Sequence, residues 1–116
     1  MVERTRRSIT TYCRACEDGA MAKLSDAEIS SQLAKLPNWS LKDGKLHREY
    51  KFSDFAHAFG FMATAAPLIE KRDHHPEWAN VYNRVTVDLM THDAGGVTQK
   101  DADLAALLEG IAKKLA

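Results

Sequence analysis

Residues 39–52 read Trp-Ser-Leu-Lys-Asp-Gly-Lys-Leu-His-Arg-Glu-Tyr-Lys-Phe, and this stretch decides the fold. At its centre lies Asp43-Gly44, a dipeptide that supplies the positive backbone angles of a two-residue hairpin turn. Apolar residues flank the turn on both sides at spacings typical of half-buried strands. The stretch therefore predicts two antiparallel strands.

A short helix is predicted upstream of this hairpin. Ser25 and Glu28 have the spacing of a capping box, in which each side chain binds the backbone N–H of the other residue. Pro37 would end the helix. Its apolar face consists of Ile29, Leu33 and Leu36.

A longer helix is predicted downstream, with Ser53 or Asp54 as its cap. Pro67 lies inside this segment, and a proline there removes a backbone donor, so the helix should kink or end early. The residues expected to form its buried face are Phe55, Phe59, Met62, Ala66 and Ile69.

A second hairpin and a third helix complete the pattern. The run 78–82 and the alternating residues 85–89 predict two strands that turn near Asn83 and Arg84. Thr98 can cap the last helix, with Asp101 near its positive end. The buried stripe of that helix is expected to be Leu104, Leu107, Leu108, Ile111 and Leu115.

The predicted order is thus α-β-β-α-β-β-α. The economical α+β arrangement is a four-stranded antiparallel sheet with the helices packed on one face, because apolar helix stripes and strand faces must cover each other. The length of 116 residues suits one domain, expected at 21–116. Residues 1–20 lack an apolar pattern and predict a disordered extension.

Charge and hydropathy exclude several classes of protein. Sixteen basic and 16 acidic residues give zero net charge, which disfavours nucleic acid and anionic membranes as partners. No apolar stretch reaches the roughly 20 residues of a membrane span, and no secretory signal is evident. We expect a cytoplasmic location. Cys13 and Cys16 are too few for a disulfide framework or a four-cysteine zinc site, and we interpret them as incidental.

Three histidines lie near the ends of predicted elements: His74 and His75 after the second helix, and His92 after the last strand. Loops on a rigid scaffold often carry functional groups, so these residues indicate a site. Glu70 and Asp73 flank the pair, and a carboxylate beside an imidazole can fix its tautomer for proton transfer.

Two other interpretations of the histidines stay open. The residues could simply form a solvated helix end and a strand cap. Zinc is disfavoured, because adjacent histidines in an extended segment point in opposite directions. His47 and His57 lie inside predicted elements and are expected on the surface.

The segment Glu70-Lys-Arg-Asp-His-His-Pro-Glu-Trp78, followed by Thr91-His92-Asp93 and by Gly95-Gly96-Val-Thr with Asp101, resembles the pterin-4a-carbinolamine dehydratase family. The resemblance runs from about Leu24 to the C-terminus. It implies the fold predicted above, assembled as dimers or tetramers. Pro67 departs from the family pattern, in which the long helix usually continues without proline.

The resemblance also implies an activity: loss of water from 4a-hydroxytetrahydrobiopterin or a related pterin, without cofactor or metal, in tetrahydrobiopterin recycling. His74 and His92 would act as acids at opposite faces of the ring, and His75 as base or positioning group. The residues expected around the pterin are Glu70, Asp73, Trp78, Thr91 and Asp101. Trp78 could equally belong to the core, and Asp101 could complete a helix cap.

A rival interpretation is a binding module. Some members of the family act as dimerisation partners of a transcription factor, and some relatives assist assembly of a carbon-fixing enzyme. The assembly relatives tend to lose the histidine set, whereas all three histidines persist here. The pattern therefore favours an enzyme, with room for a secondary protein partner. A third interpretation, a metal-stabilised domain, predicts bound zinc and loss of the fold with a chelator.

Overall fold

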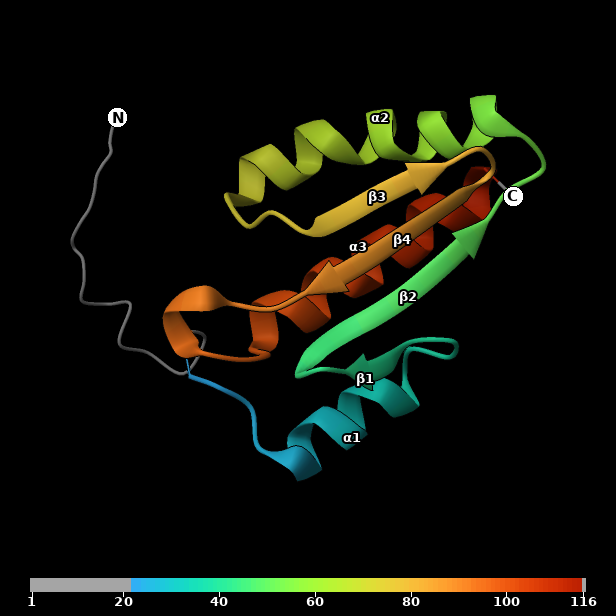
Figure 1. Cartoon of the computed structure of the whole chain (residues 1–116). Helices are drawn as coiled ribbons and strands as arrows, with labels where there is room; N and C mark the ends of the chain where they lie inside the picture. The colour runs from blue at the N-terminus through green and yellow to red at the C-terminus, as the bar shows by residue number, and fades with distance from the viewer. Residues whose placement is uncertain (1–21, 116) are drawn as a thin grey trace.

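The computed structural model describes residues 22–115, so the predicted extension at 1–20, with Cys13 and Cys16, lies outside the described residues. Helices and strands follow the predicted order, with one short 3-10 helix, η3, in addition (Figure 1). The elements are α1 (Asp26–Ala34), β1 (Ser40–Lys42), β2 (Lys45–Lys51), α2 (Phe55–Arg72), β3 (Glu77–Val81), β4 (Arg84–Leu89), η3 (His92–Ala94) and α3 (Gln99–Leu115).

The four strands form one antiparallel sheet in the order β1-β2-β4-β3. Asp43 and Gly44 have φ angles of 54° and 78°, which confirms the predicted turn of the first hairpin. In the second hairpin Val81 pairs with Arg84, so the turn consists of Tyr82 and Asn83, one residue earlier than predicted. The aromatic side chain of Tyr82 favours a strand, but its φ of 53°, which is unusual for an aromatic residue, places it in the turn.

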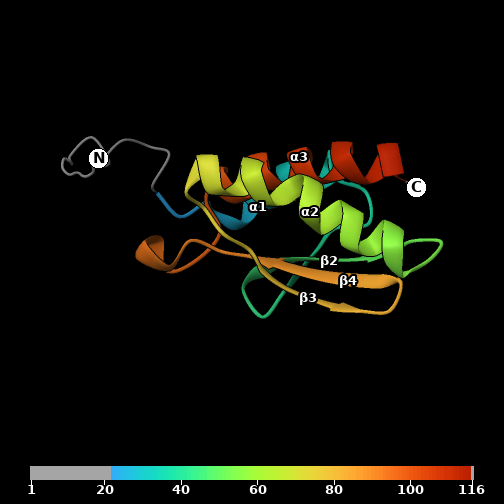
Figure 2. The same cartoon turned by 90° about the horizontal axis from the view of Figure 1, so that it is seen from above.

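The three α-helices of the described chain pack on one face of this sheet, as predicted (Figure 2). Strand residues alternate, so that Leu46 and Tyr50 of β2 and Val85 and Val87 of β4 are buried toward the helices. Two caps also agree with prediction. The Ser25–Glu28 capping box forms at the start of α1, and the Asp54 side chain accepts the His57 N–H at the start of α2.

The predicted buried face of α2 is wrong except at Ile69 and, in part, Met62. The buried residues of α2 are Ala58, Phe61, Ala65 and Ile69. Phe61 has no exposed surface and packs its ring 4.9 Å from that of Tyr50, whereas Phe55 and Phe59 are 50% and 56% exposed. The segment carries two apolar stripes at helical spacing, and periodicity alone does not say which one faces the sheet.

α2 also continues through Pro67 to Arg72, so the expectation that it ends early is wrong. Pro67 is exposed, where the carbonyl freed by its missing N–H can be hydrated. Among residues 22–115, no helix combines the length and apolar character that a bilayer span requires.

A polar cluster fastens α3 to the sheet. Glu109 Oε2 accepts hydrogen bonds from Trp39 Nε1 at 2.8 Å, Arg48 Nε at 3.0 Å and Tyr50 Oη at 2.6 Å. Burial raises the pKa of Glu109, but the hydrogen bonds from Tyr50, Arg48 and Trp39 outweigh it and hold that pKa below its ordinary value. Burial and the bond to Glu109 raise the pKa of Tyr50 well above its usual range, so this phenol remains a donor.

Candidate functional site

The end of α2, the end of β4, η3 and the start of α3 lie at one end of the molecule (Figure 1). Residues of these segments line a hollow of about 270 Å³. Its lining joins two segments of chain, 73–75 and 90–93, with one residue of α3. The lining residues are Asp73, His74, His75, Met90, Thr91, His92, Asp93 and Lys100. The structure thus brings the three predicted histidines to one hollow.

The conformation at the end of α2 sets the directions of the His74 and His75 side chains. Asp73 caps the helix in the left-handed conformation, with φ 52° and ψ 40°, and its N–H binds the Glu70 carbonyl at 3.1 Å. The chain then leaves the helix with successive side chains pointing apart. His74 Nε2 lies 2.5 Å from Asp101 Oδ1, and His75 Nε2 lies 2.9 Å from Glu70 Oε1.

Asp101 is a carboxylate with no exposed surface. Its Oδ2 accepts from Thr91 Oγ1 and from the Thr98 backbone N–H, each at 2.9 Å. The second bond completes the cap of α3, so Asp101 both caps the helix and holds His74. An ionised carboxylate only accepts hydrogen bonds, so His74 Nε2 is the donor and Nδ1 remains for other partners.

His92 lies on η3, the short helix between β4 and α3. Thr91 closes the base of this loop, because its N–H donates to the Gly96 carbonyl at 2.8 Å, and Gly95 reverses the chain with a φ of 73°. The His92 side chain is 77% exposed, and its Nε2 lies 3.7 Å from Glu77 Oε2, beyond hydrogen-bond distance. The loop therefore holds an imidazole that solvent and a ligand can reach.

The remaining predicted site residues occupy different places. Asp73 and Thr91 line the hollow, whereas Glu70 and Asp101 do not line it but bind His75 and His74. Trp78 is not among the lining residues. Its ring packs edge-on against Phe61, at 6.5 Å between centroids, beside the core. Its predicted contact with a pterin stays a prediction.

Three lining residues were missed by the sequence analysis: Met90, Asp93 and Lys100. Met90 and Asp93 flank Thr91 and His92 in the sequence, and this adjacency is the sequence feature from which their place in the hollow could have been predicted. Lys100 lies next to Asp101 in sequence but enters the hollow only because α3 packs behind His74. Within residues 22–115, no three His, Cys, Asp or Glu side chains gather closely enough to hold a metal ion.

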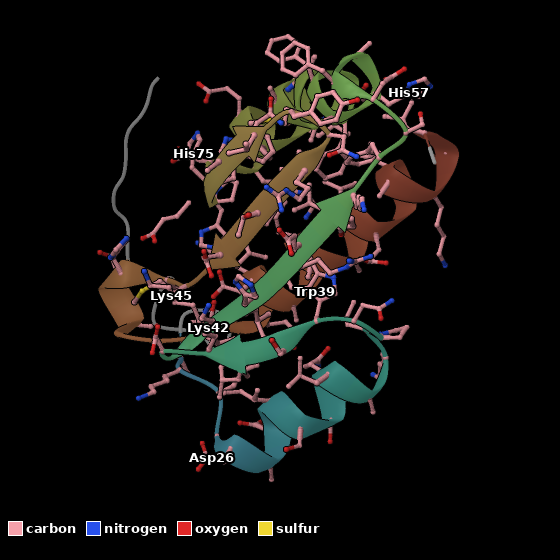
Figure 3. All side chains as sticks on the ribbon, turned by 45° about the vertical axis from the view of Figure 1, so that its right-hand side comes forward. Asp26, Trp39, Lys42, Lys45, His57 and His75 are labelled. Atoms are coloured by element: carbon pink, nitrogen blue, oxygen red, sulfur yellow. The ribbon has the colours of Figure 1, made fainter. Side chains whose placement is uncertain are left out.

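The other two histidines lie elsewhere. His47 Nδ1 binds Asp88 Oδ1 at 2.8 Å, and His57 Nδ1 binds Asp54 Oδ1 at 2.6 Å. Figure 3 shows His57 and His75 at opposite ends of α2. His57 is therefore a suitable control for substitutions in the hollow.

Comparison with known proteins gives consistent matches. The family model described as pterin 4 alpha carbinolamine dehydratase matches residues 22–111. A protein of Solibacter usitatus assigned as a pterin-4-alpha-carbinolamine dehydratase is 61% identical over 90 residues, covering 78% of this chain and 95% of the relative. One from Novosphingobium aromaticivorans, with the same assignment, is 52% identical over 77% of this chain and 95% of its own.

Solved structures agree on the fold. A transcriptional coactivator/pterin dehydratase from Brucella melitensis is 48% identical, with a TM-score of 0.75 over 78% of this chain and 98% of its own. A pterin dehydratase-like protein identified as a RuBisCO assembly factor in the alpha-carboxysome is 21% identical, with a TM-score of 0.53 over 64% of this chain and 86% of its own. The second likeness shows the fold alone.

Proposed function

The chain belongs to the pterin 4 alpha carbinolamine dehydratase family, and we propose that it removes water from a 4a-hydroxytetrahydropterin through the histidines of the hollow. It is a hydro-lyase, and the product is the quinonoid dihydropterin. The observation that carries the histidine mechanism is the convergence of His74, His75 and His92 on one hollow, with a buried carboxylate behind His74.

The reaction needs two proton transfers. The hydroxyl at carbon 4a leaves as water after it takes a proton, and a ring nitrogen loses a proton as the new double bond forms. The protons balance and no oxidation occurs, so acid and base groups suffice. Imidazoles can both give and accept protons near neutral pH.

We propose that the three histidines divide these tasks among them. His74 and His92 act as acids at opposite faces of the ring, and His75 acts as the base or positions the substrate. With His74 Nε2–H bound to Asp101, Nδ1 is the nitrogen left to exchange a proton with the pterin. To act as an acid, His74 first takes up a proton on Nδ1 and then gives it to the leaving hydroxyl, which returns the ring to its neutral Nε2–H form. Glu70 orients His75 in the same manner. Asp73 and Thr91 are proposed to contact the pterin from the wall of the hollow.

We also propose that the chain works as a homodimer or homotetramer. α2, the end of β3 and the turn after it expose large apolar side chains that a second copy would cover. These side chains are Phe55, Phe59, Leu68, Val81 and Tyr82. Asn83 links the turn to the chain just before α2, because its N–H₂ group donates to the Phe52 carbonyl at 3.0 Å.

Recycling of tetrahydrobiopterin in the cytoplasm is the physiological role that we propose. Comparing the dehydration rates of carbinolamines that carry different side chains at carbon 6 would identify the natural pterin. A preference for another side chain would replace biopterin in this role without changing the chemistry.

The test is the dehydration rate of freshly generated pterin 4a-carbinolamine. Wild-type protein should exceed the rate in buffer, and His75→Ala should lose most of that acceleration. His57→Ala, at the other end of α2, should behave as wild type. A folded wild-type protein without acceleration would refute the proposal and turn attention to partner binding.

A further inference from the structure

Two buried hydroxyl groups lie against each other, one on a residue that lines the histidine hollow and one on a residue behind it. Thr98 is fully buried and Thr91 is 5% exposed, and their Oγ1 atoms lie 2.8 Å apart. Neither hydroxyl can rely on bulk water for a partner, so the direction of this hydrogen bond follows from their other partners.

Counting protons gives that direction. A threonine hydroxyl has one proton to donate. Thr91 donates its proton to Asp101 Oδ2 at 2.9 Å, because an ionised carboxylate only accepts. The bond between the two threonines must therefore be donated by Thr98. Thr98 Oγ1 in turn accepts the Lys100 backbone N–H at 3.3 Å.

The result is a set of hydrogen bonds whose donors converge on the Asp101 carboxylate. They pass from the first turn of α3, through Thr98 and Thr91, to Oδ2 of Asp101, and Oδ1 of the same carboxylate receives His74 Nε2–H. Thr98 also contacts Asp101 directly, through its backbone N–H at 2.9 Å. Thr98 thus acts on the carboxylate from two directions without reaching the hollow.

We propose that Thr98 is a positioning residue of the dehydration site, whose hydroxyl orients Thr91 and Asp101 and thereby keeps His74 protonated on Nε2. Its effect on turnover rests on the proposed function, whereas its effect on His74 does not. A hydroxyl that served only as the cap of α3 would need its bond to Lys100 alone, and its removal would leave the imidazole unchanged.

The matched variants are Thr98→Val, which keeps the shape and removes the hydroxyl, and Thr98→Ser, which keeps the hydroxyl. Thr86→Val, on the sheet face without helices, is the control. We expect kcat of Thr98→Val to fall by roughly tenfold with little change in KM, since a small misplacement of a reacting group is costly. Thr98→Ser keeps the hydroxyl, and Thr86 lies on the other face of the sheet, so neither change should misplace a reacting group. The kcat of both variants should stay within about twofold of the wild-type value.

The deciding readout is the pair of ring ¹⁵N shifts of His74, measured without substrate and at a pH high enough that the ring is neutral, because only the neutral ring has tautomers. Wild type and Thr98→Ser should show the Nε2–H tautomer, and Thr98→Val a mixture. Wild-type shifts in folded Thr98→Val would overturn the proposal, even if the wild-type protein proved to be an active dehydratase. If the protein proved inactive, a shift in Thr98→Val would still support the positioning role.

Should Thr98→Val not fold, the wild-type protein decides the matter. A slowly exchanging Thr98 hydroxyl proton with a cross-peak to Thr91 is expected, because both groups are shielded from solvent. A hydroxyl proton that exchanges rapidly with water would contradict the proposed set of hydrogen bonds.

Discussion

Nε2 of His74 lies 2.5 Å from Oδ1 of Asp101, a carboxylate 27 positions away in sequence that has no exposed surface. The contact joins the loop after α2 to the first turn of α3. It leaves one ring nitrogen of His74 committed to the protein and the other available to a ligand. Under the proposed mechanism, the activity of His74 is sensitive to changes in residues that never touch the substrate.

Asp101→Asn should therefore lower kcat on the order of 100-fold, because the amide can donate to His74 and favour the wrong tautomer. Asp103→Asn is the matched control, since Asp103 is exposed two residues farther along α3. Steady-state kinetics with both variants, after circular dichroism has shown an intact fold, provide the measurement. Equal activities would show that the buried carboxylate only caps the helix.

His92→Ala should lower turnover by about 100-fold, the typical cost of removing a general acid. The fold should persist, because the side chain is 77% exposed and makes no hydrogen bond within the described residues. Thermal unfolding and dehydration rates of this variant and of His57→Ala make the comparison. Normal turnover in folded His92→Ala would remove this residue from the mechanism.

Glu109→Gln should destabilise the protein by about 1 to 2 kcal/mol at pH 7, since three donors lose a charged acceptor. The pKa of Glu109 is lower in the folded protein than in the unfolded chain. Its stabilisation is therefore complete above the ordinary glutamate pKa and disappears as the pH falls through the folded value.

Urea unfolding at several pH values tests whether the stabilisation by Glu109 is lost as the pH falls. The stability difference between wild type and Glu109→Gln should shrink as the pH falls below about 4, where glutamate becomes protonated. Glu49→Gln, on an exposed position of β2, should show no such difference. A stability difference between wild type and Glu109→Gln that grew as the pH fell would contradict the role given to Glu109.

Phe59→Glu should convert the proposed oligomer to monomer, because a charge on an apolar contact surface opposes association. Phe59 is 56% exposed, so the monomer should stay folded. Sedimentation equilibrium gives the mass, and Ser31→Glu, an exposed position of α1, is the control. A wild-type monomer would overturn the oligomer proposal, and an oligomeric Phe59→Glu would mean that another surface forms the interface.

Much of the fold could be predicted because its signals are local. The Asp43-Gly44 turn and the Ser25–Glu28 capping box each depend on residues that are neighbours in sequence, and both form as predicted. The face of α2 could not be predicted, since Phe59 and Phe61 lie on competing apolar stripes. Only the aromatic cluster of Phe61 with Tyr50 and Phe52 selects one of them.

The site residues also fall into those that the sequence predicts and those that depend on packing. The positions of His74, His75 and His92 at element ends, together with the family resemblance, predict these three histidines. The sequence could place Asp101 at a helix cap, but its contact with His74 depends on how α3 packs beside the end of α2. The contacts of Lys100 and of the Thr98 hydroxyl depend on the same packing, so no local sequence pattern predicts that these residues belong to the site.

The most direct test of the central claim is the rate at which freshly generated pterin 4a-carbinolamine dehydrates in the presence of wild-type protein and of the double variant His74→Ala/His92→Ala. Histidine catalysis predicts strong acceleration by the wild type and a rate close to that of buffer for a folded double variant. Equal acceleration by the two proteins would place the chemistry outside these histidines and contradict the account.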